Sequence, residues 1–272
     1  GAQQYPADAK LFDGRLFLAG ADKWGGSVPD NFASFEFTET DAGAIWRRNA
    51  SGSVNPIRWI LPLARLLLGT DGTEHTVRSS TFDEALTPSN NGLRPISTRG
   101  VANIEPAVID TFGLYVDRTR RRLMAMSYDV DLQDYRPRSL FRLHRRLGKP
   151  GLSQMDVARN PDTRVFIVRD DGQLVVLLMN SEEDVQAYGR IKTTGTVESV
   201  AVLPAEPGEE EDEVYVVVKR TVNGSEVRSV ELLGSFELED DEPQYAGYAD
   251  AAVLYDGASA TTIPGGSHLI NE

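Results

Sequence analysis

Short apolar runs recur along the chain, and polar turn residues separate them. Each run is rich in Leu, Val, Ile, Phe and Tyr, a composition typical of buried β-strands. The runs begin about fifty residues apart, close to the roughly 40–50 residues of a propeller blade. They occupy residues 16–18, 66–68, 114–116, 165–168 and 214–218.

Turn signals and further strand-like segments surround these runs. Asp171-Gly172 and Asn223-Gly224 supply the positive backbone φ angles that tight hairpins require. Four runs therefore have a predicted partner strand on each side. The upstream partners are 57–61, 107–110, 155–158 and 197–203, and the downstream partners are 73–77, 123–126, 174–179 and 227–232.

The evenly spaced units predict an all-β fold. A single thin antiparallel sheet cannot bury both of its faces, so several such sheets must stack on one another. We predict a β-propeller-like stack of about five units over residues 1–233. A two-sheet sandwich is the alternative, and the even spacing favours the propeller.

One short helix is predicted within this domain, over residues 138–147. Leu140, Leu143 and Leu147 fall at helical spacing, and Gly148 with Pro150 would end the helix. Its other face is rich in arginine. The helix is either a surface helix packed on a blade or an interface helix.

The composition changes after residue 233. Residues 236–244 are acidic and linker-like, and strand-like character resumes over 248–263. We therefore place a boundary near Gly234 and predict that 234–272 forms an acidic linker and the beginning of a C-terminal β domain.

Charge is distributed unevenly along a chain whose net charge is −13. Tight sequence-specific duplex binding normally requires a basic face, so the total charge argues against it. The middle of the chain is nevertheless basic, while 206–213 and 237–242 are acidic. These zones are either solvated faces or oppositely charged surfaces that meet between subunits. The candidate interface residues are Arg118, Arg120, Arg121, Arg122, Arg138, Arg142, Arg145 and Arg146.

Five segments in a fixed order resemble a known family. They are 5–20 (YPADAKLFDGRLFLAG) with 24–27 and 30–32, then 54–59 with 67–70, 85–90, 197–204, and 255–257 with 261–263 and 268–269. In this order they are similar to the nozzle or hub protein of tailed bacteriophages, of the tail tubular protein B type. The chain resembles an internal part of that family's pattern, and we expect it to be a fragment.

The resemblance implies a non-enzymatic virion component with a propeller-like portion. Such a protein would form a homo-oligomeric ring around the DNA exit channel, with transient, non-specific contact with passing DNA. Its partners would be other tail proteins, namely adaptor, tube, and fibres or spikes. It would be assembled in the bacterial host cytoplasm, and it would need no cofactor and no membrane span.

Signals for catalysis are weak. The chain has no cysteine, and its three histidines lie far apart, which makes a zinc site improbable. Asp129, Asp131 and Asp134 either bind a cation or form a polar connection, and their spacing lacks the glycine and glutamate of an EF-hand loop. We therefore predict no catalytic, cofactor-binding or metal-ligating residues.

Two rival functions remain open. A carbohydrate-binding or glycan-cleaving propeller would need a pocket with exposed aromatic rings and two facing carboxylates. Trp24 is the candidate exposed ring, although packing in the core is the favoured interpretation, as it is for Trp59. A general interaction scaffold is the other rival, and the ordered segments argue against it.

Overall fold

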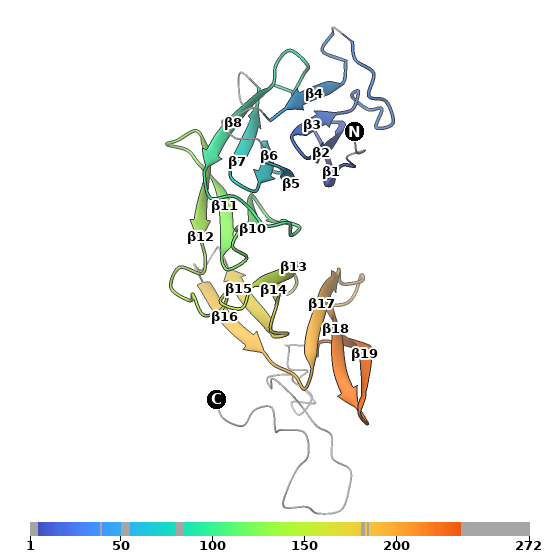
Figure 1. Cartoon of the computed structure of the whole chain (residues 1–272), viewed down its shortest axis with the longest axis vertical. Coiled ribbons are helices and arrows are strands. Elements are labelled where there is room, and N and C mark those ends of the chain that lie inside the picture. Colours follow the sequence, from blue (N-terminus) through green and yellow to red (C-terminus); the bar gives the residue numbers. More distant parts are fainter. Residues whose placement is uncertain are drawn as a thin grey trace, which may run out of the picture. The chain divides into compact units, whose positions relative to one another are not determined.

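The computed structural model describes residues 5–38, 40–49, 55–79, 84–180, 183 and 185–234. The described residues form nineteen β-strands and no helix, and they divide into two compact units, residues 1–149 and 150–272 (Figure 1). The all-β prediction is confirmed. The sequence did not predict the division at residue 149, and the predicted C-terminal domain lies outside the described residues except for Gly234.

Three four-stranded antiparallel sheets make up the first unit. The first sheet has the order β1 (Asp8–Phe12), β2 (Arg15–Gly20), β3 (Lys23–Gly26) and β4 (Ile45–Arg48). The second has β5 (Ile57–Pro62), β6 (Leu66–Thr70), β7 (Glu74–Arg78) and β8 (Gly92–Ser97). The third has β9 (Ala107–Ile109), β10 (Phe112–Val116), β11 (Leu123–Asp129) and β12 (Asp134–Ser139).

Two antiparallel sheets make up the described part of the second unit. The fourth sheet has the order β13 (Leu152–Ala158), β14 (Thr163–Arg169), β15 (Leu174–Asn180) and β16 (Val185–Ile191). The fifth has β17 (Thr196–Leu203), β18 (Glu213–Val222) and β19 (Ser225–Leu232). Asn223 and Gly224 turn the chain between β18 and β19 with φ angles of 51° and 80°, which confirms the hairpin predicted there.

Successive sheets within each unit stack face to face through apolar layers, as propeller blades do. The second sheet is covered on both sides, because alternate residues of one strand point to opposite faces. Leu66 and Leu68 pack towards the first sheet, whereas Leu67 packs towards the third. Trp24 and Trp59 are both only 1% exposed, so their predicted place in the core is confirmed. In the second unit, Phe166, Val200 and Val216 belong to one layer between the fourth and fifth sheets.

A recurring aspartate contact also ties neighbouring sheets together. One carboxylate oxygen of Asp8 accepts the next residue's N–H, and the other accepts the N–H of Ile60 on β5 at 2.7 Å. Asp156 does the same in the second unit, where its second oxygen accepts the N–H of Val202 on β17 at 2.8 Å. The same contact in both units supports the predicted internal repeat.

The predicted helix over 138–147 is wrong. β12 extends to Ser139 and pairs with β11, and residues 140–149 form turns. Leu143 is 88% exposed, so the three leucines share no buried face. Short helices need such a face to be stable, and the positive charges of Arg142, Arg145 and Arg146 at helical spacing would repel one another.

Candidate functional site

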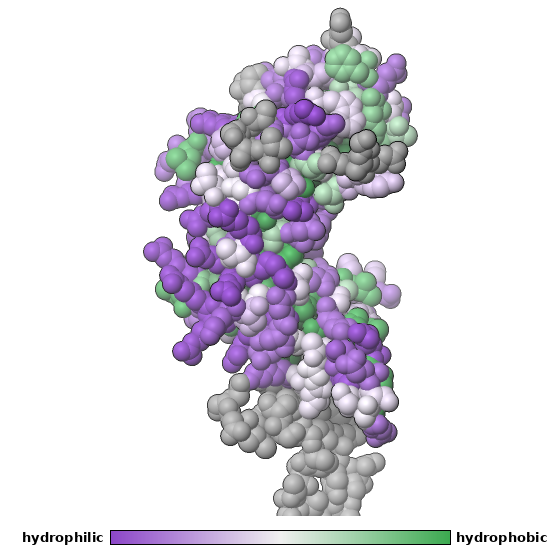
Figure 2. All heavy atoms as spheres, viewed as in Figure 1, coloured by the Kyte–Doolittle hydropathy of each residue, from purple (hydrophilic) through white to green (hydrophobic). Residues whose placement is uncertain are grey.

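A large open depression in the first unit carries most of the exposed basic residues of the middle segment. Its volume is about 1130 Å³. Hydrophilic side chains gather over β12 and the segment that follows it, at the left edge of the view (Figure 2). Nine cationic side chains line the depression: Arg99, Arg121, Arg122, Arg136, Arg138, Arg142, Arg145, Arg146 and Lys149.

A rigid turn between β10 and β11 presents two of these arginines. The buried carboxylate of Asp117 accepts the hydroxyl of Thr119 at 2.7 Å and the backbone N–H groups of Arg121 and Arg122 at 3.2 Å each. The aspartate therefore fixes the turn from inside, and the two arginine side chains are left on its exposed side.

β12 and the turns after it present six more of these cations. Arg136 and Arg138 are exposed and alternate along β12, so they lie on one face of that strand. Leu140 and Phe141 are buried and anchor the following segment. The N–H of Leu140 also donates to the carbonyl of Leu123 at 2.9 Å. Anchored in this way, the segment directs its arginines towards solvent.

Very little negative charge offsets these cations. Asp129 is the one carboxylate among the lining residues, and it lies 3.6 Å from a guanidinium nitrogen of Arg136. Within the ranges that the structure describes, the other eight lining cations form no ion pair with a carboxylate. Their mutual repulsion is relieved when an anion binds, so the depression is an anion-attracting surface.

The structure brings together six of the eight predicted interface residues. Arg121, Arg122, Arg138, Arg142, Arg145 and Arg146 line the depression, whereas Arg118 and Arg120 are exposed outside the lining. Arg136 and Lys149 belong to the same basic segment, and their charge could have indicated them. Arg99 comes from the connection between β8 and β9, where no sequence signal pointed to it.

The acidic triplet does not form a cation site. Asp129 accepts the N–H groups of Asp131 and Leu132 at 3.1 and 3.2 Å, which closes a turn. Among the described residues, no group of three or more His, Asp or Glu side chains could hold a metal ion. Asp129 and Asp131 therefore belong to a polar connection between β11 and β12, one of the two interpretations offered by the sequence.

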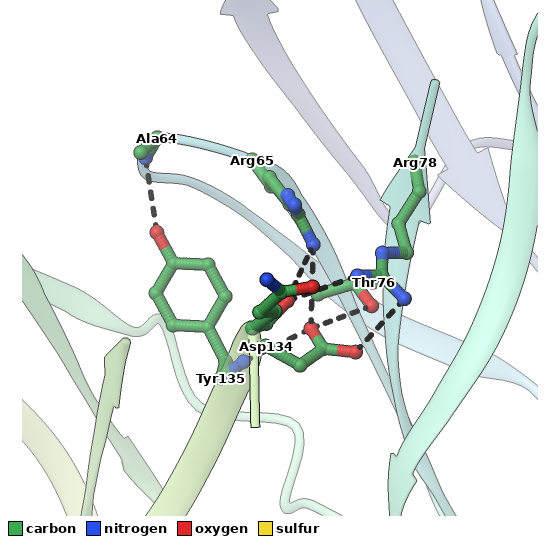
Figure 3. A network of polar contacts seen from close by, with 7 residues as sticks. Ala64, Arg65, Thr76, Arg78, Asp134 and Tyr135 are labelled. Atoms are coloured by element: carbon green, nitrogen blue, oxygen red, sulfur yellow. Dashed lines mark hydrogen bonds and ion pairs between the residues drawn. The ribbon is translucent and has the colours of Figure 1, made fainter. Parts of the chain in front are cut away.

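Asp134 has a different role, because it joins the second and third sheets. Its carboxylate accepts the hydroxyl of Thr76 at 3.2 Å and points between Arg65 and Arg78, at 3.8 and 3.5 Å (Figure 3). The neighbouring Tyr135 hydroxyl accepts the N–H of Ala64 at 3.1 Å. These contacts fix β12, and with it the arginines of β12, against the second sheet.

A smaller depression of about 240 Å³ contains two carboxylates, those of Asp13 and Glu84. Both are engaged in local structure. Asp13 accepts the N–H of Leu86 at 3.2 Å, and Glu84 accepts the side-chain amide of Asn90 at 2.7 Å. Since both accept hydrogen bonds that hold the 84–90 segment, they are structural groups and give no support to glycan cleavage.

His75 is buried on β7, and burial lowers its pKa, although the nearby Glu74 carboxylate acts in the opposite direction. His144 is exposed, as predicted from its position in the arginine-rich segment. In the described ranges, no helix has the length and hydrophobicity needed to cross a bilayer.

Comparison with known proteins gives little. No protein-family model and no curated protein matches the chain. Among solved structures, one of a luciferin-regenerating enzyme is similar over 76% of this chain and 80% of its own, with 13% sequence identity and a TM-score of 0.29. A likeness this low has no bearing on function, so the functional argument depends on the chain's own residues.

Proposed function

We propose that this chain is a structural component of a bacteriophage tail, part of a nozzle or hub. The observation that carries the proposal is the stack of thin sheets joined by buried and partly buried polar groups. Apolar layers hold each sheet to the next, and Asp8, Asp134 and Asp156 add directional contacts between sheets. A stack joined in this way resists sliding, which suits a part that bears load while DNA passes.

The five ordered segments add support from the sequence. They fall in both structural units, and they agree with the order expected of the nozzle family. In the proposed assembly the chain forms part of a homo-oligomeric ring, assembled in the host cytoplasm, and contacts adaptor, tube, and fibre or spike proteins. The role is mechanical and non-enzymatic.

The charge distribution of the chain suggests how the ring interacts with the DNA that passes through it. The basic depression has a formal charge of +8, so the rest of a chain with a net charge of −13 carries −21. We propose that part of this acidic surface faces the channel, because like charges do not adhere to phosphates.

The proposed tail function can be tested on purified phage particles. Tailed particles purified from the bacterium that carries the gene are expected to contain this chain, in a fixed ratio to the portal subunit, by quantitative mass spectrometry. A cryo-electron microscopy map of those tails should then accept the two units near the DNA exit. Particles with intact tails that lack the chain would refute the proposal.

A further inference from the structure

We propose that the basic depression of the first unit is a sequence-independent binding site for the phosphate backbone of nucleic acid. This goes beyond the proposed tail function and does not depend on it, because it follows from the lining residues alone. The site consists of the turn after β10, strand β12 and the turns of residues 140–149.

The cations that line the depression are of the type that binds phosphate groups well. Eight of the nine lining cations are arginines. The planar guanidinium donates two parallel hydrogen bonds to a phosphate or a carboxylate, whereas lysine acts as a compact point charge. An arginine-lined surface therefore fits a row of oxyanions better than an isolated ion.

The surroundings of the arginines favour nucleic acid over an acidic protein. Protein–protein interfaces place apolar anchors at the centre and lose charge there, while nucleic-acid interfaces are much more positively charged. In this depression Phe141 is only 1% exposed and is therefore unavailable as an anchor, and the exposed apolar residue of the lining is the small side chain of Val130. Arginines are eight of the sixteen lining residues.

The lining also predicts the mode of binding. It contains no Asn or Gln to read adenine edges, and its arginines can contact phosphate oxygens at every base pair but guanine edges only at some. Its aromatic residues are Phe141, which is buried, and Tyr128, which is partly buried, contacts Tyr135 edge to face and has the Arg65 guanidinium 5.7 Å from its ring centroid. The lining therefore offers no fully exposed aromatic ring for base stacking. Recognition would then depend on backbone charge and not on sequence.

The rest of the first unit has no such excess of positive charge. Residues 1–149 contain 20 Lys and Arg and 17 Asp and Glu, a net charge of +3, and the depression accounts for +8, so the remainder of this unit carries −5. The charge attraction of the depression falls off over about 10 Å at 0.1 M salt. The site is therefore expected to hold nucleic acid at one place without wrapping it.

The experiment measures fluorescence anisotropy of a labelled 30-base-pair duplex titrated with the full chain. We expect binding at 50 mM salt that is equal for AT-rich and GC-rich duplexes. With about five phosphate contacts, the affinity should fall by about 500-fold between 50 and 200 mM salt.

Two double variants distinguish binding at the depression from binding that depends only on the total charge of the chain. Arg142→Gln with Arg146→Gln removes two lining cations, and Arg94→Gln with Arg118→Gln removes two exposed cations outside the lining. The Arg142 and Arg146 double variant should bind the duplex at least tenfold more weakly. The slope of log affinity against log salt concentration should also become less steep by about two. The Arg94 and Arg118 double variant should change the affinity by less than about twofold. All four side chains are exposed, so both proteins should keep the wild-type circular dichroism spectrum and melting temperature.

Three results would overturn the proposal. They are no binding at 50 mM salt, equal losses in the two double variants, and displacement of the duplex by polyglutamate at a lower charge concentration than by unlabelled duplex. The last result would assign the depression to an acidic polypeptide. Since the tail function is tested on particles and this site on the isolated chain, either can fail without the other.

Discussion

The phenol of Tyr115 donates a 2.7 Å hydrogen bond to the carboxylate of Glu74, and both residues are fully buried. Tyr115 lies on β10 of the third sheet and Glu74 on β7 of the second, so the bond crosses between two stacked sheets. Burial raises the pKa of Tyr115, and the adjacent carboxylate raises it further. Glu74 also accepts the hydroxyl of Ser97 at 2.7 Å, so its charge is held by donors from two elements.

Replacing Tyr115 by Phe should destabilise the first unit. The substitution removes one donor from a buried carboxylate, and a hydrogen bond to a charged group contributes about 1.5–3 kcal/mol. The three tryptophans all lie in this unit, so urea unfolding followed by tryptophan fluorescence reports on it. Tyr5→Phe is the matched control, because Tyr5 is 79% exposed and should change stability by less than about 0.5 kcal/mol. Equal effects of the two substitutions would refute a structural role for this bond.

A glycine beneath Trp59 gives a second prediction. A Cβ atom at Gly69 would lie 2.3 Å from a ring carbon of Trp59, whereas a Cβ at Gly189 would meet nothing within 4 Å. Overpacking of a core typically costs about 1–3 kcal/mol. Gly69→Ala is therefore expected to lower the melting temperature by several degrees, and Gly189→Ala, also within a strand, to leave it unchanged or raise it. An unchanged melting temperature in Gly69→Ala would mean that the ring can move.

The sequence predicted the buried strands well because they carry the apolar runs. It missed the outer strands β4, β8, β12 and β16, so the second, third and fourth sheets each have one strand more than predicted. In the first sheet it also missed β1 and β3, because no partner strand was predicted for the run at 16–18. The reason is physical: β16 is almost wholly exposed and half of the residues of β8 are, so neither strand needs an apolar run. The last two residues of β12, Arg138 and Ser139, were predicted to begin a helix because the leucine spacing after them is that of a helical face.

The candidate site was predictable only as a concentration of charge. Arginine density indicated a basic zone, and six of the predicted residues do meet in the depression. The meeting of Arg99 with the basic segment depends on the packing of β12 near β8, a contact between residues far apart in sequence. The aspartate contacts between sheets could not be predicted from the sequence either, because each of these aspartates is one polar residue among many.

Acid should weaken the second unit through Asp212. Burial raises its pKa, but the backbone N–H groups of Arg159, Ala205 and Asn160 and the Asn160 amide outweigh that effect and hold the pKa below its ordinary value. A carboxyl with a lowered pKa stabilises the fold above its unfolded-state pKa. That stabilisation is lost as the pH falls through the folded-state pKa, below about pH 4.

Asp212→Asn provides the comparison for this pH effect. Hydrogen exchange of peptides covering residues 157–162 and 203–214, corrected for intrinsic rates, should show less protection in the variant than in the wild type at pH 7. The difference should narrow as the pH is lowered from 7 through the folded-state pKa of Asp212, where the wild-type carboxyl becomes protonated. A difference that stays constant with pH would show that the charge of Asp212 does not contribute.

The repeated aspartate contact between sheets permits the same substitution in both units. Asp8→Ala leaves the N–H of Ile60 without its acceptor, and Asp156→Ala does the same to Val202. Ile60 is fully buried, and an unsatisfied buried N–H costs about 1–3 kcal/mol, so Asp8→Ala should destabilise the first unit by that amount. Val202 is only half-buried, so Asp156→Ala should destabilise the second unit by less. Tryptophan fluorescence measures the first, and hydrogen exchange of the Val202 peptide measures the second. Asp131→Ala, in an exposed turn, is the control and should have little effect.

Asp8→Asn keeps one acceptor oxygen for the Ile60 N–H and removes the attraction to Lys10, at 3.7 Å. The amide NH2 takes the place of the oxygen that accepts the N–H of the exposed Ala9. Asn should therefore cost less stability than Ala, and equal costs would contradict a stabilising role for the hydrogen bond to Ile60.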